Sequence, residues 1–109
     1  MNTSTDLPSE EMRALDAAFG LAKSAVSPLG HAEAKERLQE MFPALLPARI
    51  EGIYLRGTEL AGACYDVGDQ CRNKRITDAE AIASLRQRFP GFSAEGYNQA
   101  LSWGYFISR

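Results

Sequence analysis

The sequence predicts an all-α fold of about five helices, in which two helical hairpins with Phe-Pro corners pack around a long central helix. Apolar residues recur at alternating spacings of three and four, which is the period of a helix that buries one face. Residues that commonly cap helices precede these runs, and proline or glycine follows them. A pattern of helix, Phe-Pro corner and helix also occurs twice.

The length and composition fit one small domain. The 109 residues allow a single modest core, and the hydrophobic fraction of 45% is ordinary for a globular protein. We expect residues 1–8 to form a flexible N-terminus and residues 9–109 to form one helical domain. Residues 1–9 contain no Lys or Arg and no apolar run, and no segment approaches the roughly 20 apolar residues of a membrane helix. We therefore expect a cytoplasmic protein without a membrane partner.

The first predicted helix begins after Ser9, which is a suitable N-cap. Glu10 and Glu11 follow in the first turn, where negative charge is favoured by the helix dipole. We expect Pro28 and Gly30 to end this helix. Its buried face is predicted to contain Met12, Leu15, Phe19, Ala22 and Val26.

A second, shorter helix is predicted over residues 32–42, and Pro43 stops it. His31 is the only histidine and precedes this helix, so we expect a solvated terminal residue rather than a general base. The residues predicted to face inward are Ala34, Leu38, Met41 and Phe42.

The third helix is predicted to be the longest, over residues 47–71, with Pro47 in its first turn. Small residues form a stripe along one side of it. Its three glycines each destabilise the helix by roughly 1 kcal/mol relative to alanine, so tertiary contacts must offset this loss. We interpret this segment as the central helix of the domain or of a homodimer formed through the stripe. The heptad positions are Ile50, Gly57, Cys64 and Cys71 at one site and Ile53, Leu60 and Val67 at the other; the stripe is Gly57, Ala61, Cys64 and Gly68.

The two cysteines are predicted to be small core residues. Cys64 and Cys71 are seven residues apart, which is roughly 10 Å along one helix and too far for a disulfide bond.

Two further helices complete the predicted domain. Residues 77–80, with the sequence TDAE, match a capping box, and Ile76 is placed as a hydrophobic staple. Ile82, Leu85 and Phe89 then mark a buried face until Pro90-Gly91, and Ser93 caps the last helix. Its aligned residues are Tyr97, Ala100, Leu101 and Gly104. Segment 103–107 is apolar all the way round, so it either enters the core or meets a partner.

A shift of 47 residues superimposes the Phe-Pro corner at residues 42–43 on that at residues 89–90, together with the preceding helices and Gly57 on Gly104. Both a duplication and chance explain this match. In either case, each corner prevents simple continuation of a helix, so two helical hairpins should pack together with the first helix across them.

The composition and motifs argue against several kinds of function. The net charge is -2, so a nucleic acid is not expected as a direct ligand. No nucleophile is placed beside a base, and no nucleotide-binding motif occurs, so we expect no enzyme and no cofactor. Residues 69–80 partly match an EF-hand loop, but Cys71 replaces an oxygen ligand and Lys74 replaces the glycine of the turn. Capping by Thr77 and Glu80 explains the same residues without a metal.

Small size, helical content and segment 103–107 favour an adaptor or inhibitor that docks a helix face onto another protein. We expect no catalytic residues. The residues predicted to bind the partner are Ile50, Ile53, Tyr54, Gly57, Leu60, Ala61, Cys64, Trp103, Tyr105 and Phe106.

The sequence IEGIYLRG at residues 50–57 and the sequence FPGFSAE at residues 89–95 belong to a chain that, as a whole, resembles the small helical QslA-like anti-activators of pseudomonad quorum sensing. The resemblance implies a protein that binds the ligand-sensing domain of a LuxR-type transcription activator and blocks its dimerisation, so that the activator cannot hold DNA. Two alternatives remain at this point. One is an immunity or antitoxin-type inhibitor of a toxin, and the other is a degenerate EF-hand-like sensor.

Overall fold

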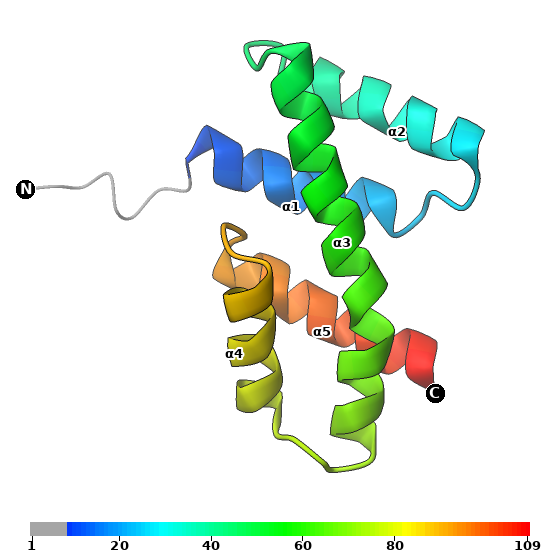
Figure 1. Cartoon of the computed structure of the whole chain (residues 1–109), viewed down its shortest axis with the longest axis vertical. Helices are drawn as coiled ribbons and strands as arrows, with labels where there is room; N and C mark the ends of the chain where they lie inside the picture. Colours follow the sequence, from blue (N-terminus) through cyan, green and yellow to red (C-terminus); the bar gives the residue numbers. More distant parts are fainter. Residues whose placement is uncertain (1–8) are drawn as a thin grey trace, which may run out of the picture.

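A computed structural model describes residues 9–109 as five helices joined by short connections (Figure 1). The predicted flexible segment 1–8 lies outside the described residues. The all-α prediction is confirmed, and the part of the chain that the structure describes contains no strand. The helices are α1 (Glu10–Ala22), α2 (Pro28–Met41), α3 (Pro47–Arg72), α4 (Asp78–Arg88) and α5 (Ala94–Ser108).

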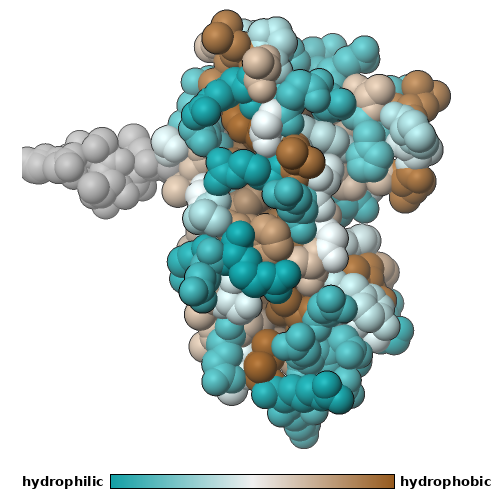
Figure 2. Space-filling model, in the orientation of Figure 1, coloured by the Kyte–Doolittle hydropathy of each residue, from teal (hydrophilic) through white to brown (hydrophobic). Residues whose placement is uncertain are grey.

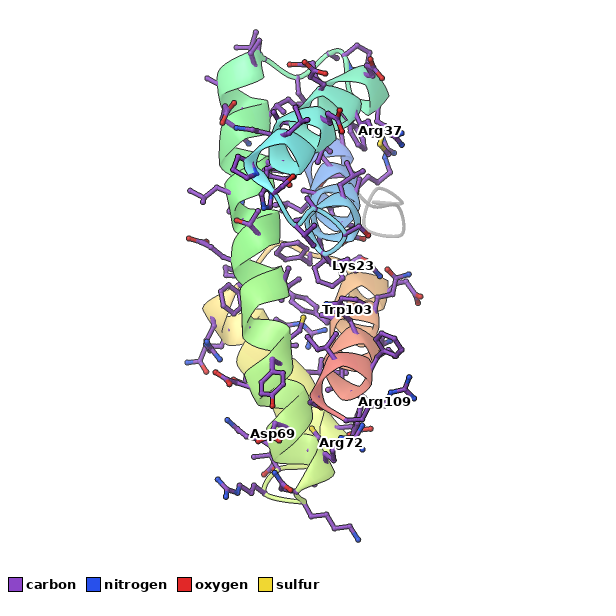
Figure 3. The ribbon with its side chains drawn as sticks, turned by 90° about the vertical axis from the view of Figure 1, so that its right-hand side faces the viewer. Lys23, Arg37, Asp69, Arg72, Trp103 and Arg109 are labelled. Carbon is purple, nitrogen blue, oxygen red and sulfur yellow. The ribbon has the colours of Figure 1, made fainter. Side chains whose placement is uncertain are left out.

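Helix α3 is the central element, as predicted. Both α1 and α5 cross it on the same side, α1 over its N-terminal half and α5 over its C-terminal half (Figures 1 and 3). The α2 helix returns towards the start of α3 through one Phe-Pro corner, and α4 is joined to α5 through the other. Helix α3 therefore lies in one layer, and α1 and α5 lie in a second layer beside it (Figure 3).

Side-chain caps begin four of the five helices. The hydroxyl of Ser9 accepts a hydrogen bond from the Met12 N–H at 3.0 Å, and Ser93 caps α5 in the same way. At α4 the predicted capping box is complete: Glu80 N–H donates to Thr77 Oγ1 at 3.1 Å, and Thr77 N–H donates to Glu80 Oε1 at 2.8 Å. These caps satisfy backbone donors that a helix start leaves free, which is why the sequence located the starts of α1, α4 and α5 correctly.

The junction between α1 and α2 differs from the prediction. Helix α1 ends at Ala22, and Val26, predicted to be buried on α1, is 92% exposed. Ser27 begins α2 instead, because its hydroxyl accepts a hydrogen bond from the Gly30 N–H at 3.0 Å. Pro28 and Gly30 therefore start α2 rather than end α1. Proline suits the first turn of a helix, where its missing N–H costs nothing.

Because α2 begins at Pro28, His31 lies within its first turns and is not a solvated terminal residue. It is half-buried, and its Nδ1 is hydrogen-bonded to the Tyr54 hydroxyl of α3 at 2.6 Å. The prediction for Met41 is also wrong: its side chain is exposed, because the next residue, Phe42, provides the ring that packs against the core.

The two Phe-Pro corners have the same backbone conformation. Phe42 follows α2 with φ −131° and ψ 67°, and Phe89 follows α4 with φ −132° and ψ 72°. In each case the phenylalanine N–H closes the last helical turn, onto the carbonyl of Leu38 or Leu85. The unit of helix, corner and helix thus repeats in the structure as it does in the sequence.

The apolar face of α3 forms the centre of the core. Both predicted heptad positions are buried along the whole helix, from Ile50 to Cys71. They pack against residues predicted for α1 and α5, including Leu15, Phe19 and Tyr97. The two cysteines are buried and free, as predicted.

Glycines bring the crossing helices into backbone contact. A Cβ atom built on Gly68 would lie 2.2 Å from the carbonyl carbon of Gly104, and one on Gly57 would lie 2.7 Å from that of Ala18. The small-residue stripe of α3 is therefore covered by the chain's own α1 and α5. Gly57, Cys64 and Gly68 of the stripe are buried, so a homodimer formed through these three residues would have to displace α1 and α5.

The segment that resembled a calcium loop is structured by helix ends instead. Residues 69–72 are the last turn of α3, and Lys74 follows with φ 61°. The Arg75 N–H donates to the Gln70 carbonyl at 2.9 Å, which completes a C-terminal cap of the Schellman type. Within residues 9–109 no group of three or more His, Cys, Asp or Glu side chains is placed to hold a metal ion.

Polar contacts connect elements that are distant in sequence. The Asp16 carboxylate of α1 accepts hydrogen bonds from the Ser93 N–H at 3.1 Å and the Ser93 hydroxyl at 2.5 Å, so it lies at the start of α5. Arg56 of α3 pairs with Glu11 and donates to the Pro90 carbonyl.

Among the described helices, none combines the length and the apolar character needed to cross a membrane.

We expect Gly68→Ala to lower the free energy of unfolding by about 3 kcal/mol or more, because the added methyl group would meet backbone that has no room to move. Gly62→Ala is the matched control, since Gly62 lies in the same helix with nothing within 4 Å of the added Cβ. That substitution should stabilise the fold by up to about 1 kcal/mol. Urea denaturation followed by circular dichroism measures both; similar effects of the two variants would contradict the close crossing of α3 and α5.

We expect Lys74→Gly to raise the free energy of unfolding by about 1 kcal/mol, because glycine adopts a positive φ without the steric cost of a Cβ. Lys74→Ala removes the same charge but keeps the Cβ, so it should give no such gain. Thermal unfolding of the two variants separates the backbone effect from the charge effect. Equal melting temperatures would show that relief of the positive φ does not stabilise the fold.

Candidate protein-docking surface

Six of the ten residues predicted to bind a partner lie in the core. The α3 seam is closed by α1 and α5, so the prediction that this seam docks a partner is wrong for this fold. A seam with heptad spacing needs an apolar cover, and the chain supplies its own. The buried residues are Ile50, Ile53, Tyr54, Gly57, Leu60 and Cys64.

The other four predicted residues retain some exposure. Ala61 is half-buried on α3. Trp103 and Tyr105 are half-buried on α5, and Phe106 is 54% exposed. The structure therefore leaves the aromatic end of α5, and not the centre of α3, as the candidate surface.

Tyr105 points away from the other two aromatic residues. Its hydroxyl donates a hydrogen bond to the Asp78 carboxylate at the start of α4, at 2.6 Å. This hydrogen bond, followed by burial, raises the pKa of Tyr105 well above its ordinary value. Because residues two apart lie on different sides of a helix, Tyr105 connects α5 to α4 while Trp103 faces the α1 side. Tyr105 is thus part of the fold rather than of the open surface.

Lys23, Trp103, Phe106 and Arg109 form a continuous row, which we call the cation–aromatic strip. The Trp103 and Phe106 rings are stacked with centroids 5.5 Å apart and planes at 25°. The Lys23 amine lies 5.3 Å from the Trp103 ring, and the Arg109 guanidinium lies 4.6 Å from the Phe106 ring. Figure 3 shows Lys23, Trp103 and Arg109 following one another in the layer of α1 and α5.

A hollow of about 350 Å³ lies beside the strip. It is lined by the aromatic rings of Trp103 and Phe106 and by the polar side chains of Lys23, Gln99 and Ser102. A mostly apolar lining with a few polar groups is typical of a site that binds a side chain of a partner.

The segments that build the strip contain no acidic side chain. Residues 17–32 and 96–109 include no Asp or Glu, although the whole chain carries 14. The positive charges in these segments belong to Lys23 and Arg109. Among residues 9–109, neither of them is paired with a carboxylate; the ion pairs there join Lys35 to Glu51 and two arginines to Glu11. The strip is therefore locally positive on a protein of net charge -2.

The outer face of α3 has a different character. Hydrophilic side chains cover most of the face seen in Figure 2, with isolated hydrophobic residues among them. Leu55 and Tyr65 are exposed on this helix, but the acidic Glu59 lies between them and the acidic Asp66 follows Tyr65. Single exposed apolar residues are ordinary on a protein surface. This face does not compete with the strip as a docking surface.

A second hollow, of about 300 Å³, contains the His31–Tyr54 pair between α2 and α3. The ion pair of Lys35 and Glu51 at 3.2 Å lies at its rim. The only other hydroxyl in its lining, that of Thr58, donates to the Leu55 carbonyl within α3. This hollow therefore holds a histidine without a hydroxyl or thiol nucleophile beside it that is free to react.

Sequence reasoning identified the rings of the strip but missed its cations and the polar residues that line the hollow. Gln99 and Ser102 lie at helical spacing from Phe106, on the side opposite Tyr97 and Leu101, so periodicity was a usable signal for them. Lys23 was not detectable in this way, because its position over Trp103 depends on how α1 and α5 pack.

Comparison with protein-family models, curated proteins and solved structures gives no match to this chain. Its function is therefore inferred from the chemistry of the surface.

Cys64 illustrates how fully the α3 seam is enclosed. Its thiol donates to the Leu60 carbonyl at 3.3 Å. Burial raises the pKa of this thiol to about 12, and the nearby positive charge of Lys23 opposes the rise only in part.

We expect Cys64 to make folding stability depend on alkaline pH. Its pKa is higher in the folded chain than the ordinary 9.0, so the stabilisation is complete below pH 9.0 and is lost as the pH rises towards about 12. The free energy of unfolding of the wild type should fall by at most about 1.4 kcal/mol per pH unit more than that of Cys64→Ala. Urea denaturation at a series of pH values measures the difference, and parallel pH profiles would show that the thiol is not enclosed.

Proposed function

We propose that this chain is a protein-binding negative regulator that sequesters a LuxR-type transcription activator. It docks on the ligand-sensing domain of the activator, blocks dimerisation and thereby prevents DNA binding. The observation that carries the proposal is the open aromatic end of α5, where Trp103 stacks on Phe106 beside a hollow lined by aromatic and polar side chains.

The residue types at this surface are those that anchor protein interfaces. Tryptophan and arginine are enriched among the residues that contribute most binding energy, and such residues lie near the centre of an interface. Here the Trp103 indole is half-buried by its own chain. A partner residue that fills the hollow would remove Trp103 and Phe106 from water together.

The surface is also held rigidly before any partner arrives. Gly104, next to Trp103, is in backbone contact with α3, and Arg72 of α3 donates to the Tyr105 carbonyl at 2.6 Å. Rigid anchors lose little conformational entropy on binding, which increases the affinity gained per contact. A preorganised helix face suits a protein that must compete with the activator's own subunit contact.

The identity of the activator rests on the resemblance to QslA-like anti-activators at residues 50–57 and 89–95. In this fold those segments build the α3 core and the second Phe-Pro corner, so they position α5 and do not form the docking surface. An interface able to exclude a second activator subunit should bury at least about 1,000 Å² in total. The strip is the proposed centre of that interface.

The alternative of an immunity or antitoxin-type inhibitor is less well supported. Such a protein is expected to present clustered carboxylates to a basic toxin. The strip presents Lys23 and Arg109 instead, and no Asp or Glu lies in the segments that form it.

We expect Trp103→Ala and Phe106→Ala each to weaken binding to the ligand-sensing domain by about 2 kcal/mol, as for central anchors of other interfaces. Tyr65→Ala is the matched control, because Tyr65 is 51% exposed on α3, away from the strip. Titration calorimetry with LuxR-type ligand-sensing domains measures the affinity, and size-exclusion chromatography measures whether the domain loses its dimer.

Circular dichroism shows whether each variant keeps its helices. Phe106→Ala should leave helicity unchanged, since its ring is mostly exposed. Undiminished binding by both folded variants, or equal losses for Tyr65→Ala, would place the interface elsewhere.

A further inference from the structure

We infer that the cation–aromatic strip recognises an amphipathic helix whose apolar face is flanked by carboxylates. The inference rests on the proposed function, because it specifies the chemistry of the partner at the same surface. It is argued from charge, from the geometry of the strip and from the secondary structure of this chain.

The charge argument starts from the unpaired cations. Lys23 lies over two rings, at 5.5 Å from Phe19 and 5.3 Å from Trp103, and no carboxylate of residues 9–109 neutralises it. Docking of any partner removes water from this amine. A neutral or basic partner would leave it desolvated and unpaired, which is costly, whereas a carboxylate would complete an ion pair. The strip therefore selects an acidic partner and rejects a basic one.

The geometry places the two cations at the two ends of the apolar row. Steps of 5.3 Å, 5.5 Å and 4.6 Å lead from Lys23 over Trp103 and Phe106 to Arg109. The path from one cation to the other is therefore at most about 15 Å long, which is the rise of about ten residues of a partner helix. Carboxylates up to about ten residues apart, on either side of the apolar residues that cover the two rings, match this row.

A helix is favoured over a strand as the bound element. Extended peptides bind by adding a strand to an open sheet edge, and residues 9–109 offer no sheet. The strip instead follows the axis of α5 and is flanked by the end of α1, with the hollow between them. A shallow hollow beside a helix accepts the apolar face of a second helix.

A second copy of this chain is the competing occupant. The outer face of α3 carries exposed Leu55 and Tyr65 with Glu59 and Asp66, so it has both apolar and acidic groups. Its apolar residues are separated by charges, which makes it a poorer match than a continuous apolar face.

The test uses two synthetic helices of about 18 residues, long enough to form in water with an alanine-rich background. Both present the same leucine face; one has glutamates flanking it and the other has lysines. Trp103 is the only tryptophan of the chain, so its fluorescence reports binding at the strip directly. We expect the glutamate helix to bind at least about tenfold more tightly than the lysine helix at low salt.

Lys23→Glu should reverse this preference, because the added carboxylate repels the glutamate helix and attracts the lysine helix. Lys74→Glu is the matched control: it makes the same charge change at an exposed residue beyond the end of α3 and should keep the wild-type preference. Equal binding of the two helices, no binding of either, or an unchanged preference in Lys23→Glu would overturn the inference. Sedimentation of the protein alone as a dimer that Lys23→Glu dissociates would assign the strip to a second copy and also overturn it.

The outcomes separate this inference from the proposed function. A LuxR-type domain that binds through Trp103 while the glutamate helix does not bind would overturn the acidic-helix inference and retain the regulator. Preference for the glutamate helix without binding of any LuxR-type domain would support the partner chemistry and refute the activator as the partner.

Discussion

The close crossing of α3 and α5 is the contact on which the rest of the structure depends. Gly68 and Gly104 meet backbone to backbone, so the two helices approach more closely than any side chain would allow. This contact sets how far along α3 the helix α5 crosses and which of its sides faces inward. As a result Tyr105 reaches Asp78 on α4, while Trp103 and Phe106 remain on the open side. A second small-residue contact, between Gly57 and Ala18, positions α1 in the same way.

These two crossings also explain why the apolar seam of α3 is not exposed. One long helix of 26 residues carries an apolar seam along its whole length, and two shorter helices cover it. The seam is therefore buried in the core, and Phe106 near the end of α5 is among the large apolar side chains that stay exposed. Lys23 and Arg109 stabilise the Trp103 and Phe106 rings through cation–π contacts.

Polar contacts connect both ends of α5 to α1 and α3. Asp16 of α1 accepts two hydrogen bonds at the start of α5, and Arg56 joins α3 to both Glu11 and the second Phe-Pro corner. Arg72 closes the other end by donating to α5 at the Tyr105 carbonyl. Each contact connects residues more than 30 positions apart, so the docking surface depends on the whole fold rather than on one helix.

Local signals in the sequence determined the helices. The caps at Ser9, Thr77 and Ser93, the Phe-Pro corners and the buried positions of α3 were all predictable, because they depend on residues a few positions apart. The start of α2 was not, since Pro28 and Gly30 are compatible with the end of one helix and the start of another. Whether each apolar stripe lies in the core or on the surface was decided only by the tertiary structure. An apolar stripe shows that a helix must be covered, but the cover comes from residues distant in sequence, and only their packing shows that it belongs to the same chain.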